Sequence, residues 1–207
     1  METYDQAVKN ILKDLPSESD YLDYKEQAYS FKGKKFDNKK KYEFLKDIIA
    51  MANVQEVPTN YRFIIVGVDD NKNPIGINDA DWADDSVYQE LINKIEPHLS
   101  VNTGTVSYEG KDYGYFCVNP EEYQVYMINE RCHFDPEAKL LNQAFVRHGS
   151  STGKLTDEEI AQIHNKAQEK AAKIKSQNDA LFSAQKTMAE AALIGSWDEN
   201  KEEDRAL

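Results

Sequence analysis

Residues 62–68, with the sequence RFIIVGV, constrain the fold more than any other segment of the chain. The run is apolar almost throughout and is bounded by turn residues. A strand that is apolar on both faces is typical of a central strand that is covered on both sides. We therefore expect a mixed α/β fold (α+β) around a central mixed sheet.

Helical and strand patterns alternate around this run. Apolar residues recur at helical spacing in the segment that ends at Pro16 and in residues 41–53 and 86–95, and each of these patterns predicts a helix. Alternating or β-branched and aromatic residues predict strands at 21–29, 75–77, 106–108, 113–118, 123–128 and 144–147. The pair at 106–118 has a short turn with Gly110 and reads as a hairpin.

A long helix is predicted after residue 156, because Thr156 and Glu159 have the spacing of a capping box. Positions 167, 171, 174, 178, 181, 185, 188 and 192 form a heptad seam of modest apolarity. The helix either packs on its own domain, pairs in a homo-oligomer or forms a stalk. We expect Gly195 and Ser196 to end it, which predicts a domain at 1–156, a helix at 157–194 and an acidic tail at 195–207. The tail could also begin a further domain or meet a partner subunit.

The charge is unevenly distributed. The 207 residues carry a formal charge of −12, which argues against a protein coated with basic side chains for non-specific nucleic-acid binding. Residues 25–46, however, hold eight lysines against three acids, a local +5. Two cysteines, no signal peptide and no apolar run of membrane-spanning length predict a cytoplasmic protein without a membrane partner.

Four residues could carry chemistry: Glu18, Asp23, Lys25 and Asp70. Asp23 and Lys25 alternate onto one face of the strand predicted at 21–29, and Asp70 follows the central strand. If the two strands are neighbours, three carboxylates and one ammonium converge. Carboxylates are preferred ligands of Mg²⁺ and Mn²⁺, which activate water for phosphodiester hydrolysis. The alternative is that these are solvated strand ends and a helix cap.

The wider pattern resembles a known family. Five segments occur in order: Glu18-Ser19 followed by Asp23-Tyr24-Lys25, then FLKDIIAMAN at 44–53, IVGVDD at 65–70, PIGI at 74–77 and FVRHGSST at 145–152. Together they resemble the Schlafen AlbA-like (AlbA_2) domain, whose bacterial members are often labelled ATP-binding. The resemblance covers about residues 15–160, most of the chain.

The resemblance implies metal-binding catalytic acids at Glu18, Asp23 and Asp70, with Lys25 as their cationic partner, as in RNA-cleaving Schlafen proteins. This chain departs from the pattern in two places. Asp23 stands where the family usually has Glu, and residues 54–61 replace the usual Gly-Gly loop.

Two further segments could bind phosphate. Arg147, Ser150, Ser151 and Thr152 could form a cradle, or Arg147 could pair with an acid in a strand end that leads into the capped helix. Lysines with aromatic neighbours could grip a nucleic-acid backbone, or could form a solvated loop. These lysines are Lys32, Lys34, Lys35, Lys39 and Lys40.

We therefore expect an Mg²⁺- or Mn²⁺-dependent endonuclease. Its preferred substrate would be RNA, either tRNA or single-stranded, with DNA as the less favoured option, and it would serve as an effector domain of a bacterial defence system. The alternative is a non-catalytic sensor module that binds a nucleotide such as ATP, or a nucleic acid. A third possibility is a structural oligomerisation module.

Overall fold

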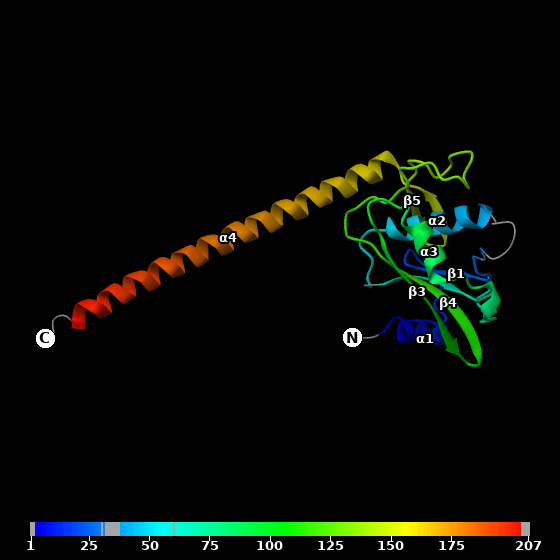
Figure 1. Ribbon diagram of the computed structural model, residues 1–207, viewed down its shortest axis with the longest axis horizontal. Coiled ribbons are helices and arrows are strands. Elements are labelled where there is room, and N and C mark those ends of the chain that lie inside the picture. The colour runs from blue at the N-terminus through cyan, green and yellow to red at the C-terminus, as the bar shows by residue number, and fades with distance from the viewer. Residues whose placement is uncertain (1–2, 30, 32–37, 60, 204–207) are drawn as a thin grey trace. The chain divides into compact units, whose positions relative to one another are not determined.

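The protein is described from a computed structural model, in which residues 3–29, 31, 38–59 and 61–203 are defined, with side chains defined except at 79 and 191–203. Helices and strands alternate in a mixed α+β fold, as expected (Figure 1). The elements are α1 (Tyr4–Asp14), β1 (Leu22–Lys25), α2 (Asn38–Ala52), β2 (Arg62–Val66), η1 (Asp79–Asp81), α3 (Asp85–Ile92), β3 (Ser100–Tyr108), β4 (Lys111–Asn119), β5 (Phe145–His148), β6 (Ser151–Lys154) and α4 (Asp157–Glu203).

The main sheet has four strands in the order β1-β2-β4-β3. Strand β1 runs parallel to β2, and the other neighbours are antiparallel. The predicted central strand therefore lies inside the sheet, between β1 and β4. Strands β5 and β6 form a separate two-stranded hairpin.

Each face of the main sheet has its own apolar core. On one face, α1 packs on alternate residues of β1, β2 and β4, such as Tyr24, Phe63 and Tyr115. On the other, α2 and α3 lie side by side over Ile64 and Phe116 (Figure 1). The continuous apolar run of β2 is thus explained, since both of its faces are covered.

Four of the predicted elements differ in the structure. The strand predicted at 21–29 covers only Leu22–Lys25. Residues 75–77 and 123–128 make isolated bridges and no strand, because the backbone turns at Gly76 (φ +80°) and at Tyr123 (φ +60°). The helix also does not end at residues 195–196, and α4 continues to Glu203. One glycine in a helix costs only about 1 kcal/mol relative to alanine, which does not by itself end a long helix.

The chain divides into two compact units, residues 1–163 and 164–207. The capping box that starts α4 is present: the Glu159 amide donates to Thr156 Oγ1 at 3.2 Å, and the Thr156 amide donates to Glu159 Oε2 at 2.7 Å. In the second unit, Ile174, Leu181 and Met188 of the predicted seam are 47%, 59% and 73% exposed.

Asn53 joins three parts of the first unit. Its side chain is 1% exposed and follows the end of α2. Its Nδ2 donates to the carbonyls of Tyr126 (2.9 Å) and Phe145 (2.8 Å), and its Oδ1 accepts from the Tyr126 amide (2.7 Å). A single buried side chain thereby fixes the start of β5 against α2.

We expect Asn53→Ala to destabilise the domain by about 2–4 kcal/mol, since it leaves buried backbone groups without partners. Urea unfolding followed by circular dichroism measures this loss. The control is Asn102→Ala on β3, an exposed position, where we expect a change within about 0.5 kcal/mol. Equal stability of the two variants would contradict the role of Asn53.

Candidate functional site

The side chains of Asp23 and Lys25 lie on the α2 face of the sheet. Leu22 and Tyr24 pack in the core beneath α1, so the residues between and after them point the other way, as the strand alternation predicted. The pairing of β1 with β2 places Asp23 opposite Ile64.

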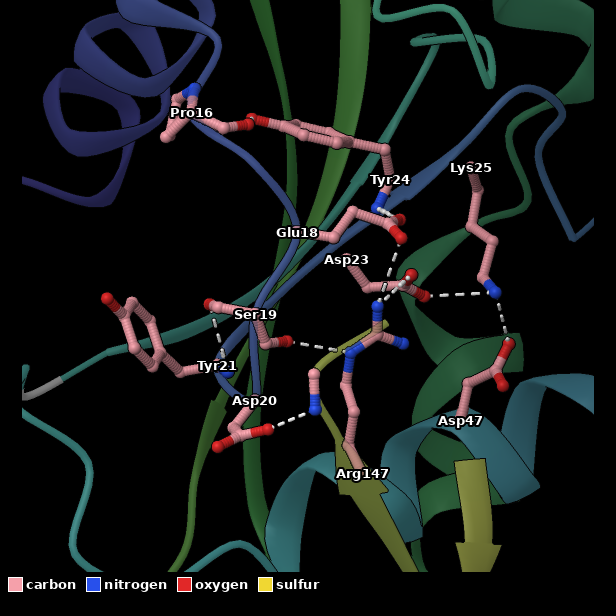
Figure 2. Close-up of polar contacts among 11 residues, drawn as sticks. Pro16, Glu18, Ser19, Asp20, Tyr21, Asp23, Tyr24, Lys25, Asp47 and Arg147 are labelled. Atoms are coloured by element: carbon pink, nitrogen blue, oxygen red, sulfur yellow. Dashed lines mark hydrogen bonds and ion pairs between the residues drawn. The ribbon is translucent and has the colours of Figure 1, made fainter. Parts of the chain in front are cut away.

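Asp23 is the centre of a buried ion-pair cluster, which consists of Glu18, Asp23, Lys25, Asp47 and Arg147. Figure 2 shows one nitrogen of the Arg147 guanidinium pointing toward the carboxyl groups of both Glu18 and Asp23. Arg147 Nη2 lies 2.8 Å from Asp23 Oδ1, and Lys25 Nζ lies 2.9 Å from Asp23 Oδ2. Lys25 also lies 3.1 Å from Asp47 on α2. The side chains of Asp23 and Arg147 are only 5% and 4% exposed.

Backbone contacts hold this cluster in place. Glu18 Oε1 accepts a hydrogen bond from the Tyr24 amide at 2.9 Å, and Glu18 Oε2 lies 3.5 Å from Arg147. Arg147 Nε donates to the Ser19 carbonyl at 2.8 Å, and the Gly149 amide donates to the Asp20 carboxylate. The β5–β6 hairpin is therefore fastened to residues 18–20 at several points (Figure 2).

Burial and charge act in opposite directions at the two central residues. Burial raises the pKa of Asp23, and the cations of Lys25 and Arg147 offset this only in part. Burial lowers the pKa of Lys25, but the carboxylates of Asp47 and Asp23 outweigh it and raise the pKa overall. The ammonium group of Lys25 therefore stays protonated at neutral pH.

Asp70 does not join the cluster. Strand β2 ends at Val66, and the backbone turns at Gly67 (φ +106°). Asp69 then builds a turn by accepting hydrogen bonds from the amides of Asn71 (2.9 Å) and Asn73 (2.7 Å), and the Asn73 bonds lower its pKa. Asp70 is left exposed on this turn. The sequence left open whether the two strands are neighbours, and they are, but the turn after β2 keeps Asp70 out of the ion-pair cluster.

Glu18 and Asp70 nevertheless share one pocket of about 440 Å³, which we call the acidic pocket. Its lining consists of Ser17, Glu18, Tyr24, Asp69, Asp70, Lys72 and Ser150. Asp23 is not part of it. Of the three expected metal ligands, two therefore face this pocket and one is buried behind Arg147.

The expected metal ligands do not fit a metal ion as they are arranged. Among the residues that the structure describes, no three acidic, histidine or cysteine side chains are grouped so that they could hold one. Both oxygens of Asp23 already face cations. Mg²⁺ also keeps several waters in its coordination shell, and a carboxyl that is 5% exposed has little room for them.

The predicted phosphate cradle is arranged differently from the expectation. Arg147 is buried and pairs with acids, which was the alternative, and so it is not open to a phosphate. Ser150 lines the acidic pocket, while Ser151 and Thr152 lie on β6. Lys32, Lys34 and Lys35 lie outside the described residues. Lys39 and Lys40 lie in the first turn of α2.

A larger pocket of about 730 Å³ opens on the other side of Lys25, and we call it the lysine pocket. Five lysines and three aromatic residues contribute to its lining: Lys25, Lys39, Lys40, Lys46, Lys139, Tyr29, Tyr42 and Phe134. Carboxylates alternate with the lysines, and several are paired, as in Lys39–Glu43 (3.7 Å) and Lys139–Glu137 (2.7 Å).

Asp47 and Tyr29 belong to the site but were missed from the sequence. Asp47 bonds Lys25 and accepts a 2.6 Å hydrogen bond from the Tyr29 hydroxyl, and burial raises the pKa of Tyr29 well above its usual range. One signal was available, because Asp47 is an acid between the buried apolar residues Leu45 and Ile48 of α2.

Comparisons with known proteins agree with the motifs. The model of the family "Schlafen, AlbA_2" matches residues 18–156. The chain belongs to this family. Its matched part includes every residue of the ion-pair cluster and of the acidic pocket except Ser17. Among curated proteins, no match was found.

Two solved structures share a distant likeness with this AlbA_2 chain. The DIP2311 protein of Corynebacterium diphtheriae has 16% identity and a TM-score of 0.48, over 75% of this chain and 27% of that one. This chain thus spans about a quarter of that protein. The N-terminal domain of an ATP-dependent DNA helicase RecG-related protein from Nitrosomonas europaea has 20% identity and a TM-score of 0.36, over 59% and 75%. Neither likeness bears on function.

A double-mutant cycle between Asp23→Asn and Arg147→Gln measures the central pair. Each single change removes one counter-charge from its buried partner, which keeps only Lys25 (for Asp23) or Glu18 (for Arg147), whereas the double change removes both charges of the pair. We expect a coupling of about 1–3 kcal/mol in the free energy of unfolding.

The control cycle uses the solvent-exposed pair Lys139–Glu137. Solvent screens an exposed pair, so its coupling should be much smaller than that of the central pair. Equal couplings in the two cycles would show that burial adds nothing to the Asp23–Arg147 pair.

Proposed function

We propose that this AlbA_2 domain binds single-stranded nucleic acid in the lysine pocket. The observation that carries the proposal is the pocket itself, in which lysines and aromatic rings line one volume of about 730 Å³. Lysines contact a phosphate backbone, and aromatic rings offer stacking faces to unpaired bases. Tyr29 and Phe134 are buried, so among the described lining residues Tyr42, a partly exposed ring, offers this stacking face.

The acids in the pocket do not prevent this. Lys39 is 81% exposed and pairs with Glu43 at 3.7 Å, and such exposed pairs contribute only about 0–1 kcal/mol. A phosphate can therefore replace Glu43 as the partner of Lys39 at little cost. The paired acids also reduce the non-specific attraction of nucleic acid to these lysines. This agrees with a chain of net charge −12 that would bind its ligand at one local site.

Lys39→Gln/Lys40→Gln should weaken binding of a fluorescent single-stranded RNA roughly tenfold at low salt. Loss of two phosphate contacts should also reduce the slope of log K against log salt by about 1.4. Fluorescence anisotropy over a salt series measures both quantities. Parallel titrations with single-stranded DNA and with ATP identify the preferred ligand class.

The matched control is Lys9→Gln/Lys13→Gln, which removes two lysines from α1 on the opposite face of the sheet. We expect its affinity and slope to stay near those of wild type. If both double variants weaken binding equally, the ligand is attracted by general charge and the lysine pocket is not its site.

A second candidate is a metal-dependent nuclease acting on tRNA or other RNA, or on DNA, as an effector of a defence system. The favouring observation is that Glu18 and Asp70, from separate loops, line the acidic pocket together with Ser150. This activity would require Arg147 to leave the carboxyl groups of Glu18 and Asp23, and it would then use Lys25 as a nearby cation.

Cleavage of tRNA and of single-stranded RNA and DNA in Mg²⁺ or Mn²⁺ tests the second candidate. A nuclease at this site should lose at least tenfold in rate on Asp70→Asn and on Glu18→Gln. Asp69→Asn is unsuitable as a control because Asp69 builds the turn, so Asp81→Asn on the exposed η1 helix serves instead. No cleavage by wild type, or equal rates in all variants, would remove this candidate.

We also propose that α4 mediates self-association. Ile174, Leu181 and Met188 are spaced by seven residues and exposed, and a heptad of apolar residues is the pattern of a coiled-coil seam.

Among the described residues, no helix has the length and apolarity of a membrane span. A cytoplasmic location remains a prediction.

A further inference from the structure

Arg147 lies where a metal ion would have to lie to bridge Glu18 and Asp23. Its Nη2 is 2.8 Å from Asp23 Oδ1 and 3.5 Å from Glu18 Oε2. We infer that the Arg147 guanidinium supplies to Glu18 and Asp23 the positive charge that a divalent metal ion would otherwise supply. These two residues therefore hold no metal in the folded protein.

Each of the four carboxylate oxygens of this pair lies near a cation or an amide, although Asp23 Oδ2 and Arg147 Nη2 make ion-pair contacts without hydrogen-bond geometry. Asp23 Oδ1 faces Arg147 and Asp23 Oδ2 faces Lys25 at 2.9 Å. Glu18 Oε1 accepts from the Tyr24 amide, and Glu18 Oε2 faces Arg147. A metal ion would have to displace at least one of these partners before it could bind either acid.

The guanidinium is also fixed in position. Its Nε donates to the Ser19 carbonyl at 2.8 Å, and the next turn is fastened by the bond from the Gly149 amide to Asp20. At the other end of β5, Asn53 bonds the Phe145 carbonyl at 2.8 Å. Arg147 therefore comes from a strand that is held at both ends, and its side chain is 4% exposed.

The local charge leads to the same conclusion. Glu18, Asp23 and Asp47 contribute three negative charges, and Lys25 and Arg147 contribute two positive ones at close range. The two side-chain cations offset two of the three carboxylate charges, so a divalent cation would be attracted far less here than by three unpaired carboxylates. The inference does not depend on nucleic-acid binding, since the lysine pocket lies beyond Lys25 and lacks Glu18, Asp23 and Arg147.

Binding of Mn²⁺ to the full chain without nucleic acid, followed by electron paramagnetic resonance of the free ion, tests the inference. Wild type and Asp23→Asn should give the same titration, because Asp23 holds no metal. Arg147→Gln should gain one saturable Mn²⁺ site, and Arg147→Gln/Asp23→Asn should lose it again. Asp70→Asn and Glu18→Gln locate any binding in the acidic pocket, and binding that depends on Asp70 but not on Glu18 leaves the inference intact, whereas binding that depends on Glu18 overturns it.

Saturable Mn²⁺ binding by wild type that Asp23→Asn abolishes would overturn the inference. So would a folded Arg147→Gln variant that gains no site, since the carboxyl pair would then not be a metal site that Arg147 occupies. Circular dichroism establishes whether Arg147→Gln folds. If it does not, the comparison of wild type with Asp23→Asn decides alone. Loss of RNA binding in the lysine-pocket variants would leave these Mn²⁺ titrations unchanged, so the two proposals fail separately.

Discussion

The ion pairs of the buried Asp23 carboxyl with Arg147 and Lys25 hold strand β1 and the β5–β6 hairpin together at the candidate site. Taking charges out of water costs several kcal/mol per ion, and good geometry must repay that cost. Here two cations approach one carboxyl from β5 and from β1 itself, at 2.8 and 2.9 Å. Because a lone buried charge is so unfavourable, the hairpin β5–β6 and the sheet edge at β1 can pack well in only one arrangement.

Patterns local in the sequence predicted the elements well. The central strand, the hairpin of β3 and β4, and the cap of α4 were each encoded within a few residues, by periodicity or by capping chemistry. Strand β6 was missed, because its residues at 151–154 are small, polar and largely exposed and give no apolar alternation. Its pairing with β5 depends on the turn at Gly149 (φ +60°).

The site was predicted only in part, for a physical reason. Alternation on a strand brings Asp23 and Lys25 together, and a sequence shows this directly. Asp47 and Arg147 reach the same point from α2 and β5, which only tertiary packing brings there. Asp70 lies in the turn that Asp69 closes by hydrogen bonds, and there it shares the acidic pocket with Glu18 but makes no ion pair with the cluster. The strand pattern alone does not give this placement.

The length of the side chain at position 23 helps to determine the contacts within the ion-pair cluster. The resemblance implies Glu at this position, and Asp23 is one methylene shorter. In the ion-pair cluster both oxygens of the shorter Asp lie within 3 Å of a cation while the group stays 5% exposed. A longer Glu would move the carboxyl one bond away from β1 and could not keep both short contacts with the same backbone. Asp23 and Arg147 are therefore best understood together, as two residues whose lengths match each other across the gap between β1 and β5.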